Sequence, residues 1–271
     1  MFVTPPLPAP LSTPQAGRRP HARVGAALAG AGLLAAGALL APPAARAAAP
    51  SPAQILALEA ALNADTPAPL AALLETGPGL DPVRLEARRR LLRQNFPDVR
   101  WRLTPGSNLR DGRPTVNLRV TGTRRQGGTL FRLQADQQLA LQTSGGRING
   151  QTVLRESSIL RSGEQELPVT LQIPDAVLTG QRYDVDLVLD DPLEGAYLAG
   201  GLRVLTPQQL AGMESPSIDL AALGGGGLFK TVQAPYSPGT QTWALLLVHP
   251  KGVISATKQV RVVADKAALQ P

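Results

Sequence analysis

Hydrophobic residues recur every three or four positions in three segments near the start of the chain, a spacing typical of amphipathic helices. The first segment, residues 51–65, opens with Ser51 and Pro52, which suit the N-cap and the first position of a helix. The second segment covers residues 67–77 and the third covers residues 82–96. The pattern therefore predicts three helices before residue 100.

The hydrophobic period changes from about 3.6 residues to two after residue 114. Apolar and polar side chains alternate through residues 114–122 and 129–142, and residues 151–160 form the next strand after a predicted turn at 144–150. Such alternation predicts antiparallel strands with one buried face, and a run of about twelve residues is long for a strand. Helices followed by a curved antiparallel sheet make an α+β layout.

The remainder of the chain consists of short apolar runs separated by glycine, proline and aspartate, which predicts strands joined by turns. Seven such strands within about 100 residues are typical of an all-β immunoglobulin-like sandwich. The predicted strands are residues 167–174, 182–190, 197–205, 217–223, 228–235, 242–250 and 253–263. Within 182–190, four side chains are expected to face the core: Tyr183, Val185, Leu187 and Leu189.

The first 47 residues have the three parts of an export signal. A basic stretch precedes the uncharged, apolar residues 24–41, and small residues around Arg46 then offer a cleavage site after Ala47. Export to the periplasm, a thylakoid lumen or the extracellular space is therefore expected, with membrane contact only transiently through the leader. A retained anchor is the alternative, and the export route, general or twin-arginine, stays open.

Charge divides the rest of the chain. Residues 81–162 carry a net charge of +10, whereas residues 163–271 carry −4. We place a domain boundary where the sign of the charge changes, at about residue 163. This predicts an α+β domain at 48–162, a sandwich at 163–266 and a tail at 267–271. Without the leader the net charge is only +3, and aromatic residues make up 3% of the chain, so a nucleic-acid partner is not expected.

The helices followed by the strand segments TVNLRVTG, TLFRLQADQQLALQ and QTVLRESSIL resemble the nuclear transport factor two-like superfamily. The resemblance covers about residues 52–162 and implies a cone-shaped sheet filled by helices. The second half, with IPDAVLTGQRYDVDLVLDDPL and GTQTWALLLVHPKGVIS, resembles exported cyanobacterial proteins of uncharacterised function that join such a domain to a sandwich. The superfamily includes isomerases and dehydratases as well as inert binding modules.

The interior of the cone is a candidate ligand site. Gln137 is the one polar residue on the inward positions of 129–142, beside the candidate ligand-binding residues Phe131 and Leu133, and Asp136 falls on the opposite face. Residues 48–162 contain no His, Tyr or Cys, so the residues for abstracting a proton from a carbon acid are not visible. No catalytic residue and no cofactor are therefore predicted.

The arginines of residues 82–96 form the strongest charged patch: Arg84, Arg88, Arg89, Arg90 and Arg93. They are interpreted either as a solvated outer face or as a surface for an anionic partner. The acidic second half could also dock on this patch, within one chain or between chains.

Acidic residues gather in 184–191, and a calcium site is a hypothesis there because carboxylates are the ligands that calcium prefers. The residues concerned are Asp184, Asp186, Asp190 and Asp191, and the alternative is a solvated strand face followed by a turn. The absence of Cys excludes disulfides and thiolate metal sites.

Two further motifs favour structural roles. His249 stands in VHPKG between two apolar runs and is expected at a hairpin corner, because no second His or Cys accompanies it. The segment 224–231, GGGGLFKT, lacks the glycine before lysine that a phosphate-binding loop requires.

The sequence favours an exported, non-enzymatic binding or assembly protein that acts through a protein partner, a homodimer or an apolar ligand in the cone. The alternatives are a small-molecule enzyme that uses the cone, with Gln137 or Asp136 polarising a carbonyl, and an envelope protein anchored by its leader.

Overall fold

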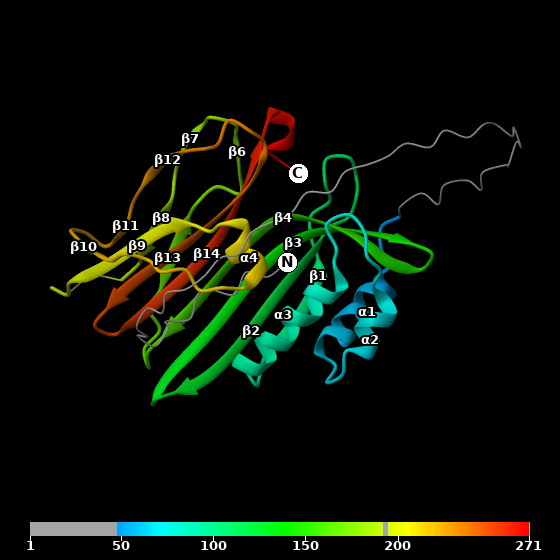
Figure 1. Cartoon of the computed structure of the whole chain (residues 1–271), viewed down its shortest axis with the longest axis horizontal. Coiled ribbons are helices and arrows are strands. Elements are labelled where there is room, and N and C mark those ends of the chain that lie inside the picture. Colours follow the sequence, from blue (N-terminus) through cyan, green and yellow to red (C-terminus); the bar gives the residue numbers. More distant parts are fainter. Residues whose placement is uncertain (1–47, 192–194, 271) are drawn as a thin grey trace, which may run out of the picture.

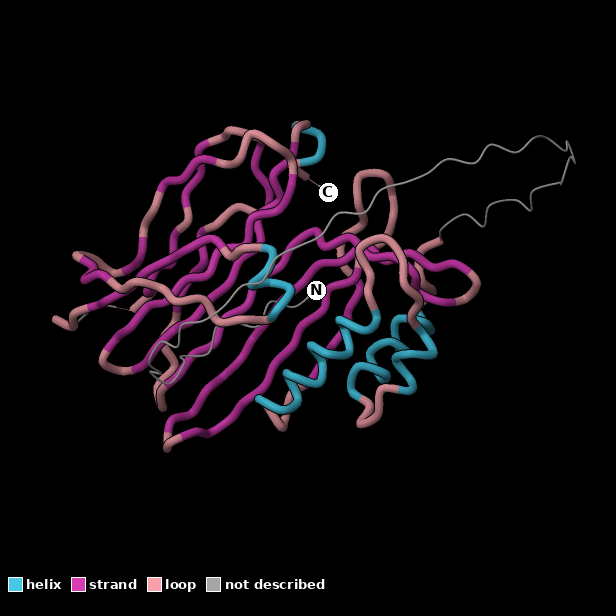
Figure 2. Tube along the Cα trace, in the orientation of Figure 1, coloured by secondary structure: helices cyan, strands magenta, loops and turns pink. Residues whose placement is uncertain are grey.

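The computed structural model describes residues 48–191 and 195–270 and shows a β-rich α+β fold. Helices cover one face of the longest strands, and shorter strands form a second layer at the far end of the molecule (Figures 1 and 2). The predicted export signal at residues 1–47, with its cleavage site at Ala47, lies outside the described residues. Within them, no helix is both long and apolar enough to cross a membrane.

The three helices expected from the hydrophobic spacing are all present: α1 is Pro52–Asn63, α2 is Ala68–Leu73 and α3 is Pro82–Asn95. Ser51 caps α1 in a capping box with Gln54, and the Asp81 carboxylate accepts the first free N–H groups of α3. A fourth helix, α4 (Pro207–Gly212), and a short 3₁₀ helix, η1 (Lys266–Ala268), were not predicted.

Four antiparallel strands form the sheet beneath these helices: β1 (Arg100–Pro105), β2 (Val116–Gln126), β3 (Thr129–Ser144) and β4 (Arg147–Ser162). The alternation predicted the inner face of β2 and β3 correctly, because Val116, Leu118 and Val120 are buried against the helices. Two register shifts between β3 and β4 curve the sheet around its core. Strand β1 was not predicted.

Side chains of α1 cover the free edge of β1. The Asn63 amide donates to the Trp101 carbonyl at 2.7 Å and accepts from the Trp101 N–H at 3.1 Å. The Glu59 carboxylate accepts from the Leu103 N–H at 2.6 Å. Pro105, on the same edge, has no N–H group that could remain unpaired. Most of the edge that could pair with another chain is therefore satisfied within the molecule.

Replacing Asn63 with Leu is expected to lower the free energy of unfolding by about 2 kcal/mol, because the N–H and C=O of Trp101 lose their partners. The open edge should also promote concentration-dependent association. Urea denaturation and size-exclusion chromatography measure the two effects. Gln94→Leu, at an exposed position near the end of α3, is the control and should change neither. An unchanged stability for Asn63→Leu would contradict the role assigned to this amide.

The second half of the described chain contains ten strands, of which only the last two are long. They are β5 (Val169–Gln172), β6 (Ala176–Leu178), β7 (Arg182–Asp184), β8 (Asp186–Leu189), β9 (Leu198–Val204), β10 (Ala221–Leu223), β11 (Gly227–Leu228), β12 (Thr231–Gln233), β13 (Gly239–His249) and β14 (Gly252–Val263). Strands β11, β8 and β5 form a small sheet, and β12 pairs with β7. The inward residues predicted for 182–190 are buried in a second apolar core, which also contains Trp243 and Leu245.

A single sheet of nine strands joins the two halves, with the order β1-β2-β3-β4-β14-β13-β9-β10 and with β6 beside β14. Strand β4 pairs with β14 from Glu156 to Arg161, and the hydroxyl groups of Ser158 and Thr257 lie 2.6 Å apart across this junction. The predicted boundary at residue 163 therefore falls between two apolar cores but not at a break in the sheet. No local sequence pattern indicates this pairing.

Candidate functional site

The space between the helices and the inner face of the sheet is nearly filled. It retains a cavity of about 30 Å³, lined mostly by leucines together with Gln137 and Gln151. A volume of this size accommodates about one water molecule. The enclosed space therefore has no room for an apolar ligand or a substrate. A separate apolar pocket of about 470 Å³ opens at its edge, between Ile55 and Leu56 of α1, Leu103 of β1 and Val116 of β2.

The three residues predicted to bind a ligand in the cone do not form a site together. Leu133 is part of the apolar core, and Phe131 packs under the Arg124 guanidinium, 4.8 Å from its ring centre. Gln137 borders the small cavity; its side chain is 4% exposed and its Nε2 has no hydrogen-bond partner among the described residues. Inside the sheet, these three positions therefore contribute to packing and do not form a shared pocket.

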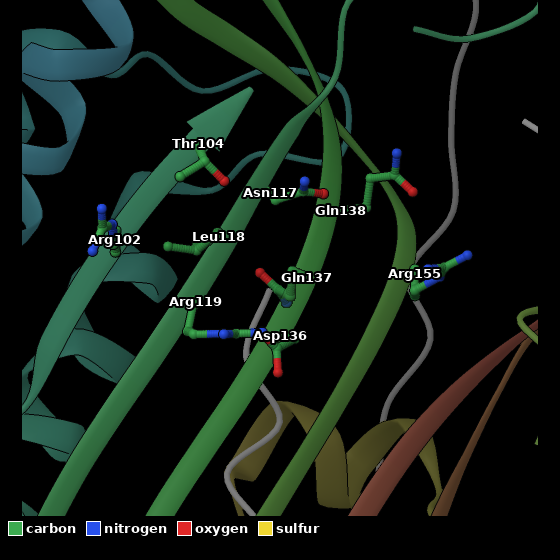
Figure 3. Close-up of a pocket in the computed structure, with 9 residues that line it drawn as sticks. All are labelled: Arg102, Thr104, Asn117, Leu118, Arg119, Asp136, Gln137, Gln138 and Arg155. Atoms are coloured by element: carbon green, nitrogen blue, oxygen red, sulfur yellow. The ribbon is translucent and has the colours of Figure 1, made fainter. Parts of the chain in front are cut away.

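The opposite face of the sheet carries a groove of about 500 Å³ (Figure 3). Its polar residues alternate with the buried ones on β1, β2 and β3, and the strand register brings them together: Arg102 lies beside Arg119, and Arg119 lies beside Asp136. The groove is lined by Arg102, Thr104, Asn117, Leu118, Arg119, Asp136, Gln137, Gln138 and Arg155. Strand alternation thus separates a filled interior from an open, polar exterior.

The groove arginines differ in their partners. Arg119 Nε donates to Asp136 Oδ1 at 2.6 Å, and Arg155 Nε is 2.6 Å from Asp175 Oδ2. Arg102 is exposed and makes no hydrogen bond or ion pair with a described residue. Asp136, the one carboxylate of the lining, also accepts from the Gln134 amide at 2.9 Å. The groove therefore presents positive charge and hydrogen-bond donors.

The chemistry of the lining suits binding better than proton transfer or nucleophilic attack. Among the described residues the lining contains no His, Cys, Ser, Lys or Tyr, and its carboxylate is already bound by an arginine and an amide. Arginine and side-chain amides remain, and these hold carboxylates and peptide groups through directed hydrogen bonds.

The basic surface lies on the sheet rather than on α3. On the outer face of β1–β4, alternation exposes a row of arginines: Arg100, Arg102, Arg119, Arg125 and Arg155. By contrast, Arg88 and Arg89 of α3 are buried, Arg93 is half-buried, and Arg84 and Arg90 remain exposed. The patch predicted on α3 is therefore not a continuous surface.

The buried arginines of α3 instead bind the end of α1. Arg89 donates to the carbonyls of Leu62 and Ala64, and Arg93 donates to the Asn63 carbonyl at 2.5 Å. These carbonyls have no partner inside α1, and cationic side chains are favourable at a helix C-terminus.

Arg88 joins the two halves of the chain. Its Nη2 donates to the Leu210 carbonyl of α4 at 3.1 Å. Burial lowers the pKa of Arg88, and the nearby Glu156 carboxylate opposes that shift. Arg88 therefore acts in internal packing, where a partner surface had been predicted.

Three of the four aspartates of the predicted calcium site accept hydrogen bonds from protein groups. Asp184 accepts from the Thr231 hydroxyl at 2.7 Å, and Asp186 accepts from the Lys230 N–H at 3.2 Å. Asp190 accepts from the Thr170 hydroxyl at 3.0 Å, and Asp191 is exposed. In the part of the chain that the structure describes, no group of three or more acidic or histidine residues is placed to hold a metal ion.

The structure places the two remaining motifs in turns and strands. His249 is 6% exposed at the end of β13, and its Nδ1 accepts from the Lys251 N–H at 3.1 Å across the hairpin corner. The glycine-rich segment leads into β11 and then β12, with no helix at its end where a phosphate could bind.

Comparison with known proteins concerns the second half of the chain. Residues 164–263 match a family described as a domain of unknown function (DUF8623). The match begins after β4 and ends with β14, so it leaves out the groove strands β1–β4. No curated protein matches the chain.

Proposed function

We propose that the protein is an exported, non-enzymatic binding protein, made of a nuclear transport factor two-like α+β unit followed by an immunoglobulin-like sandwich. The partner is bound on the outer face of the sheet, in the groove of Figure 3. The small-molecule enzyme and the leader-anchored envelope protein are the alternatives to this proposal.

The contrast between the two faces of the sheet carries the proposal. The space enclosed by the helices and the inner face is about 30 Å³, and the pocket of about 470 Å³ at its edge is lined almost wholly by apolar side chains. The outer face is open over about 500 Å³ and is lined by charged and amide side chains. Binding sites for small groups or peptides are concave and have a few convergent polar side chains, which describes the outer groove. An enzyme that works inside the cone would have to open a packed leucine core first.

Filling the groove should abolish partner binding without unfolding the protein. Asn117→Trp places a large ring in the groove. Thr121→Trp, four residues further along the same exposed face of β2, is the matched control. Each variant is purified from the envelope fraction of its own host and studied by native mass spectrometry. We expect wild type and Thr121→Trp to retain the same bound partner, and Asn117→Trp to lose about nine-tenths or more of it.

Retention of the partner by Asn117→Trp, or bare protein in every preparation, would contradict the proposal. The intact masses also report on the leader. A chain that lacks residues 1–47 supports export with cleavage, whereas a full-length chain in the membrane fraction supports the anchored alternative.

A further inference from the structure

We propose that the outer groove binds an acidic segment of a partner polypeptide, in extended conformation, with carboxylates at alternate positions. This inference rests on the proposed function, because it names the class of partner for the same groove.

The arginines of the groove keep donors available for such carboxylates. Arg119 and Arg155 each contact an internal carboxylate through Nε, and the structure assigns no hydrogen bond to the Nη groups of either side chain within the described residues. Arg102 makes no hydrogen bond or ion pair with a described residue, so its donors remain available to a ligand. A guanidinium offers five donors in a planar fork that matches a carboxylate in two-point contact. The guanidinium groups of three arginines therefore line one groove.

The spacing of these arginines suits an extended chain. Arg102 and Arg119 are direct cross-strand neighbours, with Cβ atoms expected about 5 Å apart. Arg155 stands on β4, three strands from Arg102 and two residues out of line with it, at about 16 Å by the usual spacings of strands and residues. In an extended peptide, side chains on one side repeat every ~6.8 Å, so acids at alternate positions reach successive arginines through the flexible arginine stems.

The remaining lining favours a peptide over other polyanions. Thr104, Asn117 and Gln138 provide hydroxyl and amide groups, which pair with peptide N–H and C=O groups. No aromatic ring of a described residue lines the groove, and Trp101 of β1 is buried in the core on the other face. Nucleobases depend on aromatic stacking for much of their affinity, and sugar rings commonly use the same surface. A glycan or a nucleic acid therefore finds fewer of the contacts it needs.

The direct test uses a fluorescein-labelled peptide of about eight alternating Glu and Ser residues, roughly 27 Å long when extended. Binding to the full chain is measured by fluorescence anisotropy. We expect the same peptide with Gln in place of Glu to bind at least about tenfold more weakly. An increase in salt from about 50 to about 300 mM should also weaken binding severalfold.

Arg102→Ala should weaken binding of the Glu-Ser peptide about tenfold. Arg102 has no partner within the described residues, so its removal leaves no internal charge unpaired. Arg90→Ala is the matched control, since Arg90 is an exposed arginine on α3, away from the groove, and this variant should bind within about twofold of wild type. Circular dichroism checks that both variants stay folded.

Equal affinity for the Glu and Gln peptides, or an affinity indifferent to Arg102→Ala, would overturn the inference. So would tight, Arg102-dependent binding of a heparin oligosaccharide or of vesicles with anionic lipid when the peptide fails to bind. The proposed function is still supported after those outcomes if Asn117→Trp loses its native partner. The proposed function is contradicted, whatever the peptide does, if Asn117→Trp retains that partner.

Discussion

Replacing Asp175 with Ala is expected to lower the free energy of unfolding by about 3 kcal/mol. Asp175 connects the two halves of the sheet: its carboxylate contacts Lys258 Nζ on β14 and is 2.6 Å from Arg155 Nε on β4. The Lys258 side chain is only 8% exposed. Removal of the carboxylate leaves a buried ammonium without a counter-charge, which typically costs more than the intact pair contributes.

Urea denaturation measures the change, and two further variants identify its cause. Asp136→Ala removes a carboxylate bound to arginine at the same 2.6 Å distance. Its partner Arg119 is exposed and Asp136 itself is only partly buried, so we expect a loss below about 1 kcal/mol. Adding Lys258→Met to Asp175→Ala should recover about half of the lost stability, because the isolated charge is removed as well. Equal losses for Asp175→Ala and Asp136→Ala would show that burial of Lys258 does not decide the effect.

The junction that Asp175 stabilises illustrates what a sequence pattern can and cannot predict. Helices α1 and α3 follow from residues close together in the chain, through a cap, a proline and a regular apolar spacing. The pairing of β4 with β14 joins segments about a hundred residues apart. Nothing in the sequence of either segment indicates with which other segment it pairs. Two cores were predictable from composition and charge; the shared sheet was not.

Two elements were missed for different reasons. Strand β1 has only Trp101 and Leu103 as inward apolar residues, which is too short a run to establish a period of two. Helix α4 had a usable signal, because Thr206 and Gln209 form a capping box around Pro207. Its burial is slight, so the hydrophobic spacing that supported the other helices was absent.

The candidate site shows the same division. Alternation along β2 and β3 placed Arg119 and Asp136 on the outer face correctly, and it also placed Gln137 inside. The meeting of Arg102 with Arg119 depends on a strand that was not predicted. The arginines of α3 were expected on a surface because charge usually stays solvated. The free carbonyls at the end of α1, which bind two of them, are visible only in the tertiary structure.

Arg89→Met is expected to cost about 4 kcal/mol of unfolding free energy, the largest effect among the variants considered. Arg89 is 2% exposed and contacts both oxygens of Glu86, at 2.7 and 3.1 Å. It also donates to the Leu62 and Ala64 carbonyls, the latter at 2.6 Å. Methionine fills a similar length but donates nothing, so the last carbonyls of α1 and a half-buried carboxylate lose their partner together.

Arg90→Met, one position along the same helix, separates this effect from a general loss of charge. Arg90 is exposed and makes no hydrogen bond or ion pair with a described residue, so its replacement should change stability by less than about 0.5 kcal/mol. Arg89→Lys should recover only part of the loss, because one ammonium cannot reproduce a fork that contacts Glu86 and two carbonyls at once. If thermal and urea denaturation gave the same stability for Arg89→Met and Arg90→Met, the contacts of Arg89 with Glu86 and with the end of α1 would contribute no net stability. The structural role assigned to Arg89 would then be wrong.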